Sequence, residues 1–263
     1  MKAIKQLYKA WKQCLNNPKL LAYAAVMDLI SASTLSAAMA YVWAIIIEAL
    51  GQVYTIMEQM PMVDLAEGLV TPEMIQQQAA INAQYTQIMQ WGGVLFVTFF
   101  GIWSAFQGGA WFIAHQVTRE PKARKFIPRF IAITLVAQLL GTFLVMSLGF
   151  VNTLSGPVQL DFLSTAPLLF IGGLIIFYMQ HVAYAVIGNT PFYPAWQNAI
   201  WKKLEHMLPA YAIIGFGIAL VNFIAVKVLN QDVLLGFLLT AFIAAPAYTF
   251  FRVYLIDMVK SVK

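Results

Sequence analysis

Charged residues are scarce in this chain of 263 residues. They make up only 10% of it, whereas hydrophobic residues make up 61%. Soluble globular proteins average about 25% charged and roughly 45–50% apolar residues. A soluble protein with so little charge would lack the polar surface that keeps it in solution. The composition therefore excludes that class and predicts an all-α, multi-pass membrane protein.

Cysteine is almost absent as well, because Cys14 is the only one. A single cysteine excludes an internal disulfide and leaves no cysteine spacing for a metal site. The sequence also lacks a Walker motif, a glycine-rich phosphate loop, and a serine or cysteine nucleophile with a recognisable histidine base. We therefore expect a protein that is not an enzyme and has no resident cofactor or metal.

Long apolar runs are what the chain has in abundance. A transmembrane helix needs about 20 consecutive, mostly apolar residues. Six stretches reach this length, at about residues 20–50, 91–117, 127–152, 165–187, 208–229 and 233–257. The sequence therefore predicts a single domain of six transmembrane helices over residues 1–263.

Basic residues are missing from one side of these predicted spans. Of the 16 Lys and Arg residues, only Lys227 falls on the side opposite the two termini. Cytoplasmic loops of membrane proteins carry an excess of Lys and Arg, so both termini are expected in the cytoplasm and the protein in the inner (cytoplasmic) membrane. The net charge of +5 then indicates an anionic inner leaflet as the partner of these loops, and not a nucleic acid.

The opening stretch "MKAIKQLYKAWKQCLNN" has an amphipathic pattern. One face of a helical wheel is apolar and the opposite face is basic. The apolar face consists of Ile4, Leu7, Tyr8, Trp11 and Leu15, and the basic face of Lys2, Lys5, Lys9 and Lys12. The pattern predicts that residues 1–16 form a helix lying in the inner leaflet, with its lysines among the lipid phosphates.

Three of the predicted spans begin in a similar way. Pro18, Pro128 and Pro209 stand at the start of the first, third and fifth spans, where we expect them in the first helical turn. An amphipathic cytoplasmic helix is predicted before the fifth span, at residues 190–207. We interpret the pattern as three units of surface helix plus hairpin. Mitochondrial-type carriers also have three hairpins, but the acidic and basic signature that follows their prolines is missing here.

The longest predicted outer loop, residues 51–90, contains the polar stretch "TPEMIQQQAAINAQYTQIMQ". Thr71 suits the N-cap position of a helix, and Pro72 suits its first turn. Glu73 lies near the N-terminus, where the helix dipole places partial positive charge. We expect one helix from about residue 72 to 117, and an extracytoplasmic helical hairpin over 51–90.

Several segments resemble a known group of proteins. These are "LYKAWKQCLNNPKLL", "TPEMIQQQ", "PAWQNAIWKKLEHMLPAYAI" and "FFRVYLIDMV". They are similar to six-span prokaryotic inner-membrane proteins of uncharacterised function, related to the membrane domain of some glycerophosphodiester phosphodiesterases. The resemblance implies the six-span architecture and a membrane role. It implies no catalytic activity, because no catalytic motif is part of it.

A few polar residues fall inside the predicted spans, where charge is costly and often functional. They are Asp28, His115, Gln180, His181, Arg252 and Asp257. One hypothesis is that they converge on a polar pocket open to the cytoplasm. The alternative is that Asp28 pairs with Arg252 while the histidines form local hydrogen bonds.

Metal and haem sites are weaker alternatives for the same residues. A metal bound by Asp28, His115 and His181 has no support from local ligand spacing. Paired haem ligands are expected deep in the membrane, whereas both histidines lie near one face. The stretch "MEQMPM" at 57–62 offers thioether ligands for Cu(I), although methionines are also common as adaptable packing.

Two functions follow from this reasoning. The first is a non-enzymatic membrane component, a subunit or scaffold that acts with other membrane-protein subunits or with copies of itself. The second is a small permease or permease subunit, with Asp28, His181 and Arg252 along its path. An intramembrane enzyme is a distant third.

Overall fold

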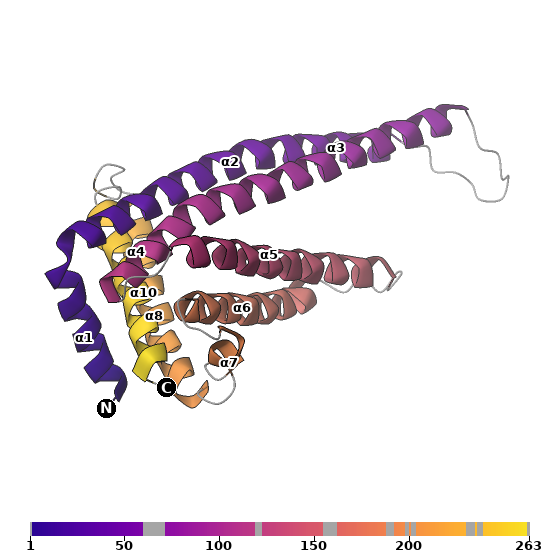
Figure 1. The fold of residues 1–263 in the computed structure, drawn as a ribbon. Helices are drawn as coiled ribbons and strands as arrows, with labels where there is room; N and C mark the ends of the chain where they lie inside the picture. The colour runs from indigo at the N-terminus through magenta and orange to yellow at the C-terminus, as the bar shows by residue number, and fades with distance from the viewer. Residues whose placement is uncertain are drawn as a thin grey trace. The chain divides into compact units, whose positions relative to one another are not determined.

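The computed structural model of this chain is helical at nearly all of the residues that it describes (Figure 1). These residues are 2–59, 72–118, 123–154, 162–187, 192–197, 200, 204–229, 235 and 239–261. Six of the helices are long and apolar enough to cross a membrane, as expected of a multi-pass membrane protein. They are Pro18–Glu58, Pro72–Thr118, Ala123–Ser147, Pro167–Val186, Tyr211–Val228 and Thr240–Lys260. Each overlaps one predicted span, although the first two begin or end well outside the predicted bounds.

The chain divides into two compact units, residues 32–102 and the remainder. Seven of the α-helices that the structure describes lie wholly in the larger unit. These are α1 (Lys2–Asn16), α4 (Gly108–Thr118), α5 (Ala123–Leu154), α6 (Phe162–Val186), α7 (Phe192–Gln197), α8 (Leu204–Leu229) and α10 (Ala245–Ser261). Helix α2 (Pro18–Glu58) begins in the larger unit, and α3 (Pro72–Ile102) belongs to the smaller one.

Helix α10 is the centre of the larger unit, because it contacts α1, α4, α6 and α8. In the sixth span 61% of the most apolar stretch is buried, against 28% or less in the other five. A helix enclosed by protein needs less hydrophobicity than one that faces lipid, and this span has the lowest mean hydropathy of the six. The enclosed helix therefore has room for polar residues such as Arg252 and Asp257.

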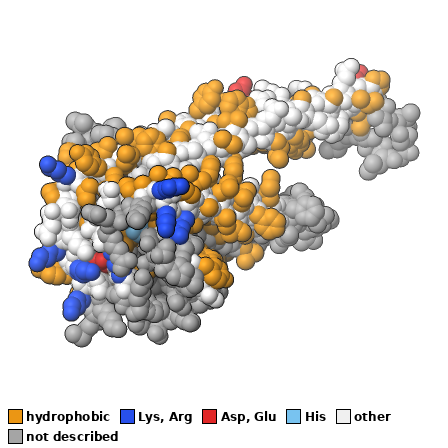
Figure 2. Space-filling model, in the orientation of Figure 1, with side chains coloured by type: hydrophobic (Ala, Val, Ile, Leu, Met, Phe, Trp, Pro, Cys, Tyr) orange, Lys and Arg blue, Asp and Glu red, His pale blue; other side chains and the backbone are white. Residues whose placement is uncertain are grey.

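The smaller unit is built on parts of α2 and α3. Its buried residues on α2 are Val42, Ile46, Ala49 and Val53, which recur at helical spacing. The two helices are linked by Gln77 Nε2, which donates to the Gln59 carbonyl at 3.5 Å, and by the rings of Tyr41 and Trp91, 6.0 Å apart. No Lys or Arg occurs in this unit, and in Figure 2 the basic side chains lie over the larger one.

The helix predicted from about 72 to 117 is present, with one local change. It begins at Pro72, and the prediction that it starts near Thr71 is confirmed to that extent. Between α3 and α4 it passes through a π-helical turn, η1 (Trp103–Gln107). A second π-helical turn, η3 (Thr240–Ala244), precedes α10. Such turns insert a residue into a helix, often near a functional site.

The predicted role of the prolines is right at one position and wrong at two. Helix α2 begins at Pro18, but Pro128 and Pro209 lie inside α5 and α8, five residues after each helix starts. Each of these two prolines removes one backbone hydrogen bond near a helix end, and such a loss is tolerated in transmembrane helices.

The predicted surface helices differ from one another in outcome. The three-unit interpretation includes a separate surface helix before the third span, and this prediction is wrong. Helix α4 ends at Thr118 and α5 begins at Ala123, which leaves no room for a separate surface helix between them. In the predicted helix 190–207 the structure has α7 and the start of α8, whereas 190–191, 198–199 and 201–203 lie outside the described residues. Residues 60–71 of the predicted outer hairpin, including Met60 and Met62, also lie outside them.

Helix α1 has the predicted apolar stripe but uses a different face for packing. Ile4, Tyr8, Trp11 and Leu15 are exposed, while Ala10 and Cys14 are buried in the core around α10. Lys9 Nζ lies 3.4 Å from Asp257 Oδ1 on α10 and is not turned wholly towards lipid. Helix α1 therefore has one face against protein, one apolar exposed face and one basic face.

Cys14 reports directly on the docking of α1. Burial, together with the nearby Asp257 carboxylate, raises the pKa of its thiol to about 11. Only about one thiol in ten thousand is then ionised at pH 7, so we expect maleimide to label native Cys14 far more slowly than the unfolded chain. Ala10→Leu should overpack the interface and speed labelling, whereas Tyr8→Leu on the exposed face should not. Labelling of native protein as fast as unfolded protein would contradict this packing.

The same thiol gives docking a pH dependence. The folded state favours the protonated thiol, so its contribution to stability is present below the ordinary pKa of 9.0 and is lost as pH rises towards about 11. Cys14→Ala should remove this alkaline loss, measured as the pH dependence of unfolding between pH 8 and 11.

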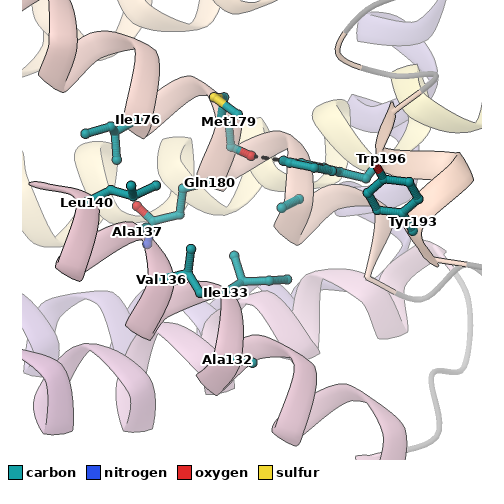
Figure 3. A pocket seen from close by; sticks show the side chains of 11 residues that line it. Ala132, Ile133, Val136, Ala137, Leu140, Ile176, Met179, Gln180, Tyr193 and Trp196 are labelled. Carbon is teal, nitrogen blue, oxygen red and sulfur yellow. Dashed lines mark hydrogen bonds between the residues drawn. The ribbon is translucent and has the colours of Figure 1, made fainter.

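Helices α5 and α6 pack side by side, and α7 lies next to one end of them. An apolar groove of about 280 Å³ lies between the three helices (Figure 3).

Candidate functional site

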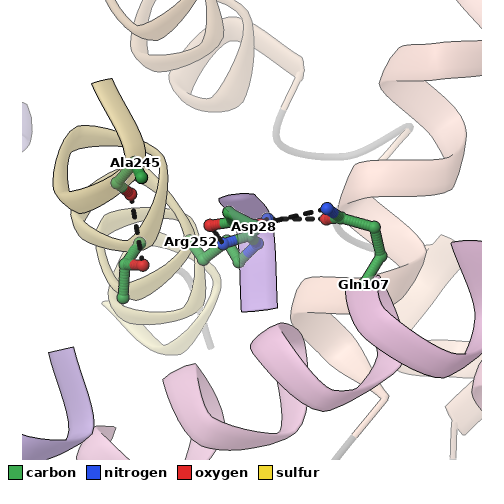
Figure 4. Close-up of polar contacts among 5 residues, drawn as sticks. Asp28, Gln107, Ala245 and Arg252 are labelled. Carbon is green, nitrogen blue, oxygen red and sulfur yellow. Dashed lines mark hydrogen bonds and ion pairs between the residues drawn. The ribbon is translucent and has the colours of Figure 1, made fainter. Parts of the chain in front are cut away.

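Asp28 and Arg252 form a two-pronged ion pair between the first and the last spans (Figure 4). Arg252 donates from its two terminal nitrogens to Oδ2 and Oδ1 of Asp28, both at 2.6 Å. Both side chains are 8% exposed. The predicted pairing is therefore confirmed in the structure, and it has the parallel geometry that makes arginine–carboxylate bonds strong.

Gln107 is the third member of this network, and the sequence reasoning missed it. Its Nε2 donates to Asp28 Oδ1 at 3.0 Å, and its Oε1 accepts from Arg252 at 2.7 Å. Gln107 is the last residue of the π-helical turn η1, and it is buried. The available signal was a glutamine inside the apolar stretch "GIWSAFQGGAWF".

The three side chains form a closed ring of hydrogen bonds, which we call the Asp28–Gln107–Arg252 network. Both Asp28 oxygens accept, and both amide atoms of Gln107 are used. The guanidinium carbon of Arg252 also lies 5.7 Å from the centre of the Trp111 ring, within range of a cation–π contact. A buried charge pair is tolerated when each polar atom has such a partner.

The two histidines form hydrogen bonds with nearby backbone. His115 Nε2–H donates to the Tyr184 carbonyl at 2.9 Å, and His181 Nδ1–H donates to the Phe177 carbonyl at 2.8 Å. The ring of His181 also lies among aromatic rings, 3.9 Å from Phe177 and 5.9 Å from Trp111. This arrangement agrees with the alternative in which the histidines are satisfied locally.

Gln180 belongs to a second chain of hydrogen bonds between α5 and α6. Its Nε2 donates to the Tyr184 hydroxyl at 2.5 Å, and that hydroxyl lies 2.6 Å from Thr134 Oγ1. Because Thr134 donates to the Phe130 carbonyl at 2.8 Å, its oxygen is left to accept from Tyr184. The rings of Phe130 and Tyr184 are stacked 4.2 Å apart. These contacts fix α5 against α6.

Asp257 lies apart from the network, on the side of α10 that faces α1. Its side chain is fully buried, and its Oδ1 is 3.4 Å from Lys9 and 3.9 Å from Lys260. Its Oδ2 has no hydrogen-bond partner in the part of the chain that the structure describes. Asp257 therefore helps to fix α1 on α10.

The structure thus sorts the predicted residues into three places. Asp28 and Arg252 are in direct contact, the histidines and Gln180 lie in the aromatic core near Trp111 and Tyr184, and Asp257 holds α1. The polar pocket that would join them stays a prediction. Within the described ranges no group of three His, Cys, Asp or Glu side chains could hold a metal ion.

Comparison of the chain with protein-family models, with curated proteins and with solved structures finds no match in any of the three.

Proposed function

We propose that this chain is a non-enzymatic component of the inner membrane that acts as a subunit or scaffold of a membrane complex. The observation that carries the proposal is the length of the two helical segments that contain the first and second spans. Pro18–Glu58 has 41 residues and Pro72–Thr118 has 47. At 1.5 Å per residue the longer one measures about 70 Å, whereas the hydrocarbon core of a bilayer is about 30 Å thick.

The surplus length has the surface of a docking site. If the membrane covers the predicted spans, the parts that project are the end of α2 and the start of α3. Four large side chains there are more than half exposed, namely Tyr54, Met57, Ile75 and Tyr85. Exposed aromatic and aliphatic side chains outside the lipid are typical of protein–protein interfaces. The resemblance to six-span membrane proteins of uncharacterised function fits such a role.

The complex itself is the test of this proposal. We expect the chain, isolated from its native membrane in a mild detergent, to have the mass of a stoichiometric complex in native mass spectrometry. Tyr54→Ala with Tyr85→Ala should release the other subunits. Phe143→Ala, which removes an exposed ring within the third span, should not. Isolation of wild type as a monomer with lipid alone would contradict the proposal.

A small permease is the second candidate, and the charges of Asp28 and Arg252 inside the spans favour it. Such a protein would use their network as part of a path that opens to the cytoplasm. Against it, both carboxylate oxygens of Asp28 and both amide atoms of Gln107 already form hydrogen bonds within the protein. Solute flux into proteoliposomes that hold the purified chain alone would favour the permease.

The topology that we propose has both termini in the cytoplasm. In a Cys14→Ala background, Lys122→Cys should react with a membrane-impermeant maleimide only after the membrane is opened, because the basic loops stay inside. Asp64→Cys should react in intact cells. Labelling of position 122 from outside would reverse the orientation.

A further inference from the structure

The groove between α5 and α6 has an open side and mostly apolar walls, which also include Gln180 (Figure 3). Ile133, Val136 and Leu140 line it from α5, and Ile176 and Met179 line it from α6. Its volume of about 280 Å³ is near the lower end of the range for small-molecule sites. Small side chains create the space, because Ala137 and Ala183 are buried in its walls.

Two aromatic side chains from α7 stand at one end of the groove. Trp196 Nε1 donates to the Met179 carbonyl at 3.5 Å, which ties α7 to α6. The Tyr193 ring lies 6.2 Å from that of Trp196, and its side chain is largely exposed. Trp and Tyr are enriched at the level of lipid headgroups, so this end of the groove is expected near the membrane surface.

Positive charge continues the same face of α5 beyond the groove. Lys125 and Arg129 precede Ile133 by eight and four residues, which places all three on one side of the helix. At 1.5 Å per residue they lie about 12 and 6 Å further along the axis, towards the end where α5 begins. Lys125 is exposed, and Arg129 donates to the Ile187 carbonyl at 3.0 Å.

We propose that this groove binds one acyl chain of an anionic phospholipid, from the leaflet in which α5 begins. The chain lies against Ile133, Val136 and Leu140, and the phosphate lies beside Arg129 and Lys125. The mostly apolar walls favour an acyl chain over a water-soluble ligand, and the cations on the same helix face match an anionic headgroup. This proposal does not depend on the proposed function.

The experiment is a lipid titration of the purified, delipidated full chain in native mass spectrometry. Phosphatidylglycerol and phosphatidylcholine with the same acyl chains are the two probes. We expect one tightly held lipid, with phosphatidylglycerol favoured by about fivefold or more, the factor that one lysine beside an anionic lipid contributes. Equal binding of both lipids would overturn the headgroup assignment.

Two matched pairs of variants locate the site. Val136→Trp should fill the groove and reduce binding of both lipids, whereas Leu135→Trp adds the same ring on the same turn but outside the groove. Lys125→Gln should reduce the preference for phosphatidylglycerol, whereas Arg124→Gln, one residue off that face, should leave it unchanged. Equal effects within either pair would overturn the proposal.

A second measurement covers the case in which Val136→Trp does not fold. Phosphatidylglycerol with brominated acyl chains should quench part of the tryptophan fluorescence of the wild type. That part should be missing in Trp196→Phe, because Trp196 lines the groove. The same quenching in both proteins would show that the acyl chain lies elsewhere.

Discussion

Asp28→Leu is expected to destabilise the protein by about 3–5 kcal/mol, the cost of leaving one charge of a buried ion pair without its partner. Among the described residues, Arg252 would then keep its hydrogen bond to Gln107 and its contact with the Trp111 ring, but not its counter-charge. Arg252→Leu should cost a similar amount, because the Asp28 carboxylate would lose its cation and keep the Gln107 amide as its partner among the described residues. Unfolding by heat or by SDS in detergent micelles measures both changes.

The double variant Asp28→Leu with Arg252→Leu should recover most of this loss. Two apolar side chains of similar size need no hydrogen bonds, so replacing a buried pair is often close to neutral. Glu48→Leu is the matched control, because Glu48 lies on the same helix and is exposed. If each single change and the double change cost the same as this control, the ion pair does not hold the first and last spans together.

Trp111→Ala should have the second largest effect. Trp111 is 1% exposed, and its ring contacts His181, Tyr184 and the Arg252 guanidinium. Removing it leaves a cavity of well over 100 Å³, which costs about 24 cal/mol per Å³ or about 3 kcal/mol in total. The loss of the contact with Arg252 adds to this. Thermal unfolding in detergent is again the measurement.

The control for this prediction is a tryptophan that faces outwards. Trp43 is 56% exposed on α2, so Trp43→Ala should change the unfolding temperature much less. Trp111→Phe should lie between the two, because a smaller ring keeps part of the packing. Equal losses at positions 43 and 111 would contradict the central place of Trp111 in the core.

The six spans and the ion pair were predictable because each depends on one strong physical term. A stretch of about twenty mostly apolar residues is best accommodated as a helix that crosses a membrane. A single acid deep in the first span needs a cation as its partner. Arg252 was the matching choice because it lies at a similar depth in the last span. The first prediction uses the length of the apolar stretches, and the second uses a charged residue inside one of them. Both features can be read directly from the sequence.

Gln107 was not predictable in the same way. Its place in the network depends on the π-helical turn at 103–107, which rotates the rest of the helix by one residue. Amphipathic periodicity assumes a uniform helix, so it cannot show such a change of register. The packing face of α1 was missed for a related reason, since Ala10 and Cys14 are too small to stand out beside Tyr8 and Trp11.

Pro128 and Pro209 show a third limit. A proline at a membrane boundary fits the first turn of a helix, and Pro18 behaves so. At the other two positions the helix begins five residues earlier. Phe126, two residues before Pro128, is 2% exposed in the core, and its burial favours a start of α5 before Pro128.

If the protein is a subunit or scaffold, the Asp28–Gln107–Arg252 network should be needed for folding and for nothing else. In native cells, the Asp28→Leu and Arg252→Leu double variant should restore expression and also the stoichiometric complex with its other subunits, as judged by native mass spectrometry. Normal expression with an intact complex is the result that a subunit or scaffold predicts. Normal expression with the complex missing would contradict it, because the two charges would then be needed for more than folding.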